Sequence, residues 1–133
     1  MKYLENFKHF DKNIFGYHIT QRRKLKSIMK KGLIPKIPVD FGNSGDLNGV
    51  YLFKTKSDAE NGLQNWFGER IEEWEEEHTK EFDEICLTID LTGLEQYLLD
   101  SVEYEWTCIT IIDPSRIISV NECTSEFFNK LFD

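Results

Sequence analysis

Alternating apolar and polar residues predict the strands of this chain. The clearest alternation covers residues 85–91, where isoleucines and leucines are separated by Cys86, Thr88 and Asp90. Side chains of a strand point to opposite faces in turn, so this pattern is typical of a half-buried strand. Four other segments rich in apolar, aromatic and β-branched residues are also predicted to contain strands: 14–19, 49–54, 104–112 and 117–120.

Apolar residues spaced three or four positions apart predict helices between these strands. The first helix is expected over 22–31, with Thr20 as its cap and Gly32 as its left-handed end. The second is expected from Ser57, because Ser57 followed by Glu60 is the pattern of a capping box. Its apolar face would consist of Leu63, Trp66, Phe67, Ile71 and Trp74.

The order of the elements favours an α+β fold. With two short helices at 92–100 and 125–132, the chain would run strand, helix, loop, strand, helix, strand, helix, strand, strand, helix. No Gly-rich phosphate loop follows a strand and βαβ units do not repeat, so a doubly wound dinucleotide fold is not supported. We expect a mixed, largely antiparallel sheet with flanking helices. The chain has no internal repeat or linker, which indicates a single domain over residues 1–133.

Residues 35–49 form the longest irregular segment of the chain. Proline, glycine, asparagine, aspartate and serine are concentrated there, and these residues favour turns. A loop of this length in a compact domain often has a function. Within it, Phe41 would either contact a substrate or fix the loop against the core.

The charge of the chain argues against broad binding of nucleic acid. Its 24 acidic and 16 basic residues give a formal charge of −8, and an acidic surface repels a phosphate backbone. A small basic patch is compatible with this balance, because six basic residues gather in the first predicted helix. They are Arg22, Arg23, Lys24, Lys26, Lys30 and Lys31. The simplest interpretation of this cluster, and of the acidic run 69–77, is two solvated helix faces.

Cysteine and histidine usage indicates neither a disulfide framework nor a metal site. Cys86, Cys108 and Cys123 are odd in number and lack CxxC spacing, and the three histidines are scattered. The first five residues lack the apolar core of a secretory signal. No apolar run approaches the roughly 18 residues that a membrane span requires. We therefore expect a soluble cytoplasmic protein with reduced thiols, no metal and no membrane contact.

Three short segments carry residues that suit ligand chemistry. Residues 16–20 contain His18, residues 49–53 contain Tyr51, and residues 102–106 contain Glu103 and Glu105. Each has a plainer explanation when taken singly. A strand histidine is commonly a hydrogen-bonded structural residue, a strand tyrosine commonly packs in a core, and a glutamate at a strand start is commonly solvated.

In this order the segments resemble the ADP-ribosyltransferase superfamily, specifically the His-Tyr-Glu branch that includes the poly(ADP-ribose) polymerases and the diphtheria-type toxins. His18 matches the histidine of the family's first strand, and Tyr51 matches the tyrosine of its Gly-Ile-Tyr-Phe-like strand. Glu105, or else Glu103, matches the glutamate that opens a late strand. The resemblance covers about residues 15–120, including the stretches 31–35 and 56–59. It implies a split, mostly antiparallel sheet with flanking helices.

The resemblance also implies that the site binds NAD+ and cleaves its glycosidic bond through an oxocarbenium-like state. His18 would hydrogen-bond a ribose hydroxyl, and the main chain of Ile19 would pair with the carboxamide. Tyr51 would stack on the cationic nicotinamide, an attraction of about 0.5–2 kcal/mol. Glu105 would bind the 2′-hydroxyl and stabilise the developing cation. Thr20 would either hydrogen-bond the ribose or cap the helix.

The chain departs from the family's pattern in three places. Ile19 follows His18 where the polymerases have glycine. Residues 59–62 stand where the polymerases place a second stacking aromatic, and none of them is aromatic. Glu103 and Glu105 form a Glu-x-Glu pattern that resembles the arginine-modifying transferases, although those enzymes have arginine where this chain has His18.

Three classes of function are consistent with these residues. The first is a mono-ADP-ribosyltransferase that uses NAD+ to modify a macromolecule, with a protein as the expected acceptor, which would suit a bacterial or phage effector such as a toxin or an anti-defence protein. The second is a catalytically inactive acidic protein on the same fold that binds or inhibits a partner. The third is a nucleic-acid-modifying transferase or a relative of the RNA 2′-phosphotransferases, supported only by the basic cluster of 22–31.

Overall fold

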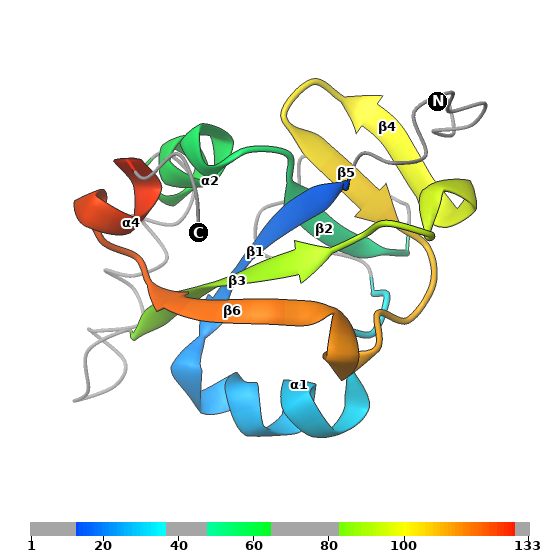
Figure 1. The fold of residues 1–133 in the computed structure, drawn as a ribbon, viewed down its shortest axis with the longest axis horizontal. Helices are drawn as coiled ribbons and strands as arrows, with labels where there is room; N and C mark the ends of the chain where they lie inside the picture. Colours follow the sequence, from blue (N-terminus) through cyan, green and yellow to red (C-terminus); the bar gives the residue numbers. More distant parts are fainter. Residues whose placement is uncertain (1–12, 37–47, 65–82, 130–133) are drawn as a thin grey trace.

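The computed structural model describes residues 13–36, 48–64 and 83–129 of the chain (Figure 1). Within these residues the fold is α+β with an antiparallel sheet, as expected. The elements in chain order are β1 (Phe15–Gln21), the 3-10 turn η1 (Arg22–Lys24), α1 (Leu25–Lys31), β2 (Val50–Phe53), α2 (Lys56–Gly62), β3 (Glu84–Asp90), the 3-10 turn η3 (Glu95–Tyr97), β4 (Leu98–Val102), β5 (Glu105–Cys108), the 3-10 turn η4 (Pro114–Arg116), β6 (Ile117–Glu122) and α4 (Ser125–Asn129).

The six described strands form one sheet in the order β4-β5-β2-β1-β3-β6. Every neighbouring pair is antiparallel. β1 pairs with β3 along all seven of its residues, whereas β1 and β2 share one register pair, Tyr17↔Phe53. The sheet therefore has two parts, β4-β5-β2 and β1-β3-β6, that meet at a narrow contact, which we call the β1–β2 joint.

Helices cover both faces of the sheet (Figure 1). Helix α1 packs on one face, which we call the α1 face, and α2 and α4 pack together on the opposite face, the α2/α4 face. The core of the α1 face consists of Ile28, Leu33, Val50, Leu52, Ile85, Leu87, Ile89, Leu91, Leu98, Cys108 and Ile112. The core of the α2/α4 face consists of Ile19, Phe53, Ala59, Cys86, Phe127 and Phe128.

Strand β3 is buried on both faces, so the expectation of a half-buried strand at 85–91 is wrong. β3 lies between β1 and β6 in the sheet. Its residues Ile85, Leu87 and Ile89 belong to the core of the α1 face, and Cys86 and Thr88, which alternate with them, are also fully buried. A strand covered on both faces need not carry large apolar residues on each, and alternation along one strand does not reveal the second cover.

The expected helix over 92–100 is also wrong. A single 3-10 turn, η3, forms there, and the chain then continues as β4. Leu98 and Leu99 pair with Cys108 and Thr107 of β5, and all four side chains are buried. Strand pairing and burial thus override the local helical spacing of the sequence.

The boundaries of α1 agree with the sequence at one end and differ at the other. Gly32 ends the helix with φ of 84°, as expected of a glycine stop. Thr20 does not cap it, because Thr20 is a buried residue of β1. The turn η1 begins after Gln21, whose side chain makes no capping hydrogen bond.

Helix α2 begins before the expected cap. The hydroxyl of Thr55 accepts a hydrogen bond from the amide of Asp58 at 3.0 Å, so Thr55 is the N-cap and Ser57 lies inside the helix. The apolar face expected to continue through residues 66–74 lies outside the described residues.

Two isolated bridges hold the chain between α1 and β2. Leu33 and Ile112 exchange main-chain hydrogen bonds of 2.9 and 3.0 Å, and Lys36 and Gly49 exchange bonds of 3.0 and 3.1 Å. The second bridge joins the two ends of the irregular segment. The interior of that segment, with Phe41, lies outside the described residues.

Gly32 is required both by its positive φ and by a close approach of the main chain. A Cβ at this position would lie 2.3 Å from the carbonyl oxygen of Ile112. Gly93 has a similar φ of 93°, but a Cβ there would meet only the flexible end of Arg116, at 3.6 Å.

We expect Gly32→Ala to lower the free energy of unfolding by about 2–3 kcal/mol and Gly93→Ala by about 1 kcal/mol. Urea unfolding of both variants measures the difference, and equal losses would contradict the close approach.

Candidate functional site

His18 lies in the middle of β1 and reaches across the β1–β2 joint. Its Nδ1 atom lies 3.0 Å from the main-chain oxygen of Tyr51 on β2. A carbonyl oxygen only accepts hydrogen bonds, so Nδ1 carries the proton and donates it. In the neutral imidazole, Nε2 is then the acceptor nitrogen. The joint therefore sets the tautomer of His18.

The surroundings of His18 lower its pKa from the ordinary value of 6.5. Desolvation of the ring is the largest cause, because burial disfavours the charged imidazolium. The positive charges of Lys36 and Lys24 lower the pKa further, while the hydrogen bond to Tyr51 opposes the shift. His18 is therefore neutral at neutral pH.

Tyr51 occupies the second position of β2, next to the joint. Its main chain pairs with Thr107 of β5 on one side and accepts the His18 hydrogen bond on the other. Its side chain is half-buried. Alternation along β2 places the ring on the same face as Phe53, which belongs to the α2/α4 core.

Glu105 is the first residue of β5, and its side chain is only 6% exposed. It lies opposite Phe53 of β2 and Val102 of β4, so it shares the face of Phe53. Glutamate is seldom buried to this extent without a partner or a function. Glu103 differs, because it is exposed in the turn between β4 and β5. The two acids of the Glu-x-Glu pattern therefore do not lie on one strand.

Ile19 and Thr20 both contribute packing to the end of β1. The side chain of Ile19 belongs to the core of the α2/α4 face, and its main chain pairs with Cys86 of β3. Thr20 pairs with Ile85 and is buried. Any contact of Ile19 with a ligand would therefore come from its main chain.

The sheet brings the three candidate strands together but not all of their side chains onto one face. β1, β2 and β5 are consecutive neighbours in the sheet, although His18, Tyr51 and Glu105 are far apart in the sequence. Tyr51 and Glu105 share the α2/α4 face. His18 pairs with Leu87 in register, which places it on the α1 face. The imidazole reaches β2 because little pairing closes the joint.

A row of register partners that the sequence did not single out continues from Glu105 across the sheet. It includes two further polar side chains, those of Thr88 and Ser119. Register pairs link Glu105 to Phe53, Phe53 to Tyr17, Tyr17 to Thr88, and Thr88 to Ser119. The Oγ1 atom of Thr88 and the Oγ atom of Ser119 are buried without a hydrogen-bond partner in the described structure. Buried hydroxyls are normally satisfied by protein, water or a ligand. Sequence patterns could not find this row because it depends on the register of five strands.

Within residues 13–36, 48–64 and 83–129, no group of three or more His, Cys, Asp or Glu side chains could hold a metal ion. In the same residues, no helix has the length and apolar character needed to span a membrane. Cys86, Cys108 and Cys123 are free thiols. Burial, together with the negative charges of Glu84 and Asp83, raises the pKa of Cys123 to about 12. A raised pKa keeps a thiol protonated at neutral pH, which lowers its reactivity.

No protein-family model matches the chain, and no curated protein has significant similarity to it. The interpretation of the site therefore depends on its geometry and on the motif resemblance described above.

The lowered pKa of His18 predicts a loss of stability as the pH falls. The unfolded chain takes up a proton at His18 near pH 6.5, whereas the folded chain does so only at lower pH. Stability is therefore complete above about pH 6.5 and decreases as the pH falls towards the folded pKa. Glutamine can keep a donor near Tyr51 but does not titrate, so His18→Gln should reduce this decrease. Urea unfolding on both sides of about pH 6.5 measures it. An identical pH dependence in the variant would contradict the assignment.

The three thiols should react slowly in the folded protein. Cys86 is fully buried, and burial raises the pKa of Cys108 as well as that of Cys123. At about pH 8, we expect their reaction with a disulfide reagent to be at least about a hundredfold slower than in urea. Rapid labelling of one thiol in the folded protein would show that its surroundings are more open.

Proposed function

We propose that the protein is an NAD+-dependent ADP-ribosyltransferase that modifies a macromolecule. The observation that supports this most directly is the adjacency of β1, β2 and β5, which carry His18, Tyr51 and Glu105. The resemblance rests on the order of these residues in the sequence, and the adjacency of their strands in the sheet is a separate observation that is consistent with it.

The narrow β1–β2 joint also supports the proposal. The resemblance implies a split sheet, and in this chain a single register pair connects β4-β5-β2 to β1-β3-β6. An opening at the joint would let the side chain of His18 act together with groups on the other face of the sheet. It would therefore reconcile the opposite alternation of His18 and Glu105 with a shared ligand.

The proposed reaction breaks the bond between the nicotinamide nitrogen and C1′ of the ribose. Nicotinamide leaves with the bonding electrons, and positive charge develops on C1′ and the ring oxygen. A nucleophilic oxygen or nitrogen of the acceptor then bonds to C1′ and releases its proton. Glu105 stabilises the developing cation and accepts a hydrogen bond from the 2′-hydroxyl, and its fixed buried position makes that stabilisation effective.

His18 and Tyr51 orient the substrate in this proposal. The neutral imidazole donates through Nδ1 to Tyr51, which leaves Nε2 to accept a hydrogen bond from a ribose hydroxyl. The ring of Tyr51 offers an aromatic face to the cationic nicotinamide. Because one hydrogen bond links the two residues, displacement of either would move the other.

A catalytically inactive binding protein is the second candidate. The observation that favours it is the placement of His18 on the α1 face, away from Tyr51 and Glu105. If the joint stays closed, these residues do not act on one ligand. Such a protein would neither bind nor consume NAD+, which separates it from the first candidate.

Variants of the two neighbouring acids test the proposal. We expect Glu105→Gln to lower the rate of nicotinamide release from NAD+ by about 10²–10³-fold, because it removes the carboxylate that stabilises the transition state. Glu103→Gln should retain at least about half of the rate, because Glu103 is exposed in a turn. Chromatography of released nicotinamide, with and without a cell lysate as a source of acceptor, measures both rates. The proposal fails if the wild-type protein releases none, and the assignment of Glu105 fails if Glu103→Gln is the inactive variant.

A further inference from the structure

One segment of this acidic protein carries basic residues and no acidic ones. No aspartate or glutamate occurs between Asp11 and Asp40, yet this segment holds half of the 16 basic residues of the chain. They are Lys12, Arg22, Arg23, Lys24, Lys26, Lys30, Lys31 and Lys36. The net charge of −8 therefore describes an uneven distribution, in which all 24 acidic residues lie outside this segment.

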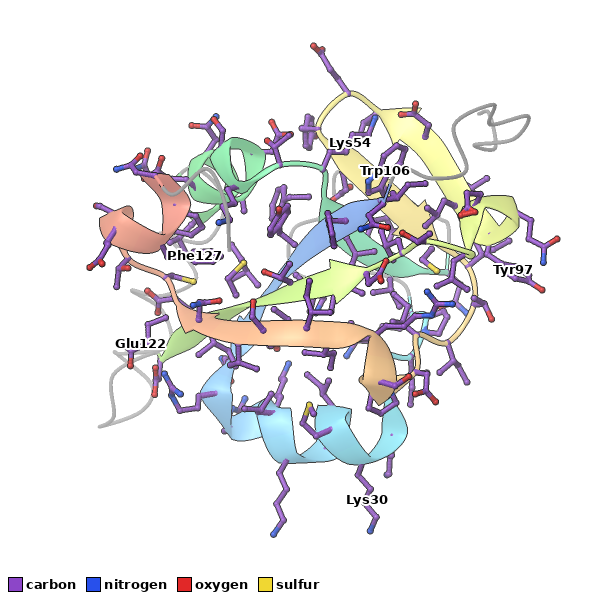
Figure 2. The ribbon with its side chains drawn as sticks, viewed as in Figure 1. Lys30, Lys54, Tyr97, Trp106, Glu122 and Phe127 are labelled. Atoms are coloured by element: carbon purple, nitrogen blue, oxygen red, sulfur yellow. The ribbon has the colours of Figure 1, made fainter. Side chains whose placement is uncertain are left out.

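The described members of this segment form an exposed basic surface along η1 and α1. Helix α1 turns Ile28 towards the core, so its charged side chains lie on the outer side. Figure 2 shows the side chain of Lys30 extending from α1 away from the sheet. We call this surface the basic face. Its members, all exposed, are Arg23, Lys24, Lys26, Lys30, Lys31 and Lys36.

Arg22, in the same segment, differs from the lysines because it forms ion pairs with a structural role. Its guanidinium bonds Asp83 at 2.8 Å and Glu122 at 3.1 Å, which ties the end of β1 to β3 and β6. Lys26, Lys30 and Lys31 form no ion pair with any described residue. The dipole of α1 favours lysines in its last turn, but it explains neither Lys26, near the start of the helix, nor Lys36, beyond its end.

The basic face continues to the candidate site. The positive charges of Lys24 and Lys36 act on the imidazole of His18. The main chain of Lys36 bonds Gly49, two residues before Tyr51. A polyanion held on the basic face would therefore lie on the same side of the sheet as His18, and it would reach Tyr51 and Glu105 only through an opening at the β1–β2 joint.

We propose that the basic face binds the phosphate backbone of a single-stranded nucleic acid and that this strand is the acceptor for the proposed transfer. Phosphates complement Lys26, Lys30 and Lys31, which pair with no acid among the described residues, and a single strand exposes base and sugar atoms that a duplex shields. The binding part stands independently of the proposed function, and the acceptor part rests on it.

Binding is tested by fluorescence anisotropy with labelled single-stranded DNA and RNA of about 12 nucleotides in about 50 mM salt. Lys26→Gln/Lys30→Gln removes two positive charges from the basic face. We expect it to raise Kd by roughly tenfold or more and to reduce the slope of log K against log salt by about 1.4. The matched control is Ser57→Glu/Asn61→Glu, which changes the net charge equally at two exposed positions of α2 and should have a much smaller effect.

Three outcomes would overturn the binding proposal. The first is no binding by the wild-type protein at low salt. The second is an equal loss in the control, which would show that only total charge matters. The third is self-association that Lys26→Gln/Lys30→Gln abolishes while oligonucleotide binding persists, which would show that the basic face docks an acidic surface of a second copy. Circular dichroism of both variants excludes unfolding as the cause.

The acceptor part is tested with NAD+ that carries a radioactive adenylate. We expect label on the oligonucleotide with the wild-type protein and roughly tenfold less with Lys26→Gln/Lys30→Gln, while nicotinamide release to water stays unchanged. Release without label on the oligonucleotide would overturn the acceptor proposal and leave the proposed function intact. Binding without any release of nicotinamide would mean that the proposed function has failed instead.

Discussion

The hydrogen bond from His18 Nδ1 to the carbonyl of Tyr51 spans the weakest connection of the sheet. In a continuous antiparallel ladder, main-chain groups of β1 and β2 would satisfy each other, and a side chain would have no place between them. Here pairing is limited to Tyr17↔Phe53, and the imidazole of His18 bonds the carbonyl of Tyr51, two residues along β2 from that pair. One bond thus supports the joint, sets the tautomer of the histidine and fixes the carbonyl of Tyr51.

The row from Glu105 to Ser119 on the α2/α4 face contains buried polar groups that lower the stability of the fold. Packing alone does not explain why they are there. Each buried polar group without a hydrogen bond costs about 1–3 kcal/mol. Thr88 and Ser119 leave two such hydroxyls, and the row ends at the buried carboxylate of Glu105. Valine or alanine in place of Thr88 would remove one cost without altering the strand. Thr88 lies on β3, inside the sheet, and Ser119 lies on the edge strand β6.

Much of the fold follows from the local sequence pattern. The predictions that are wrong concern features that depend on the three-dimensional structure. The strands at β1, β2, β3 and β6, the glycine stop of α1 and the α+β class are all visible in the sequence. β4 is not, because Leu98 and Leu99 become strand residues only through pairing with β5. The cap of α2 was misplaced because Thr55 and Ser57 offer similar hydroxyls, and only geometry decides between them.

The candidate site was predictable only as a set of residues in order. Sequence placed His18, Tyr51 and Glu105 on strands, but the neighbourhood of β1, β2 and β5 depends on long-range pairing. The distinction between Glu103 and Glu105 depends on the exact position of the β4–β5 turn. A difference of one or two residues decides which acid lies in the strand, and the alternation of apolar and polar residues does not specify it. Tyr17, Thr88 and Ser119 carry no motif at all. They share a face with Glu105 only because register aligns five strands.

Net charge and local charge lead to opposite expectations about nucleic acid, and distance decides between them. At physiological ionic strength the Debye length is about 8 Å, so charges further away are largely screened from a bound phosphate. A strand in contact with α1 would therefore experience mainly the adjacent lysines, in a segment with no acidic residue. At lower ionic strength the acids elsewhere act over longer distances, where they slow association and disfavour approach from other directions. The clustering of basic residues on α1, and not the net charge, thus supports the proposed binding at one surface.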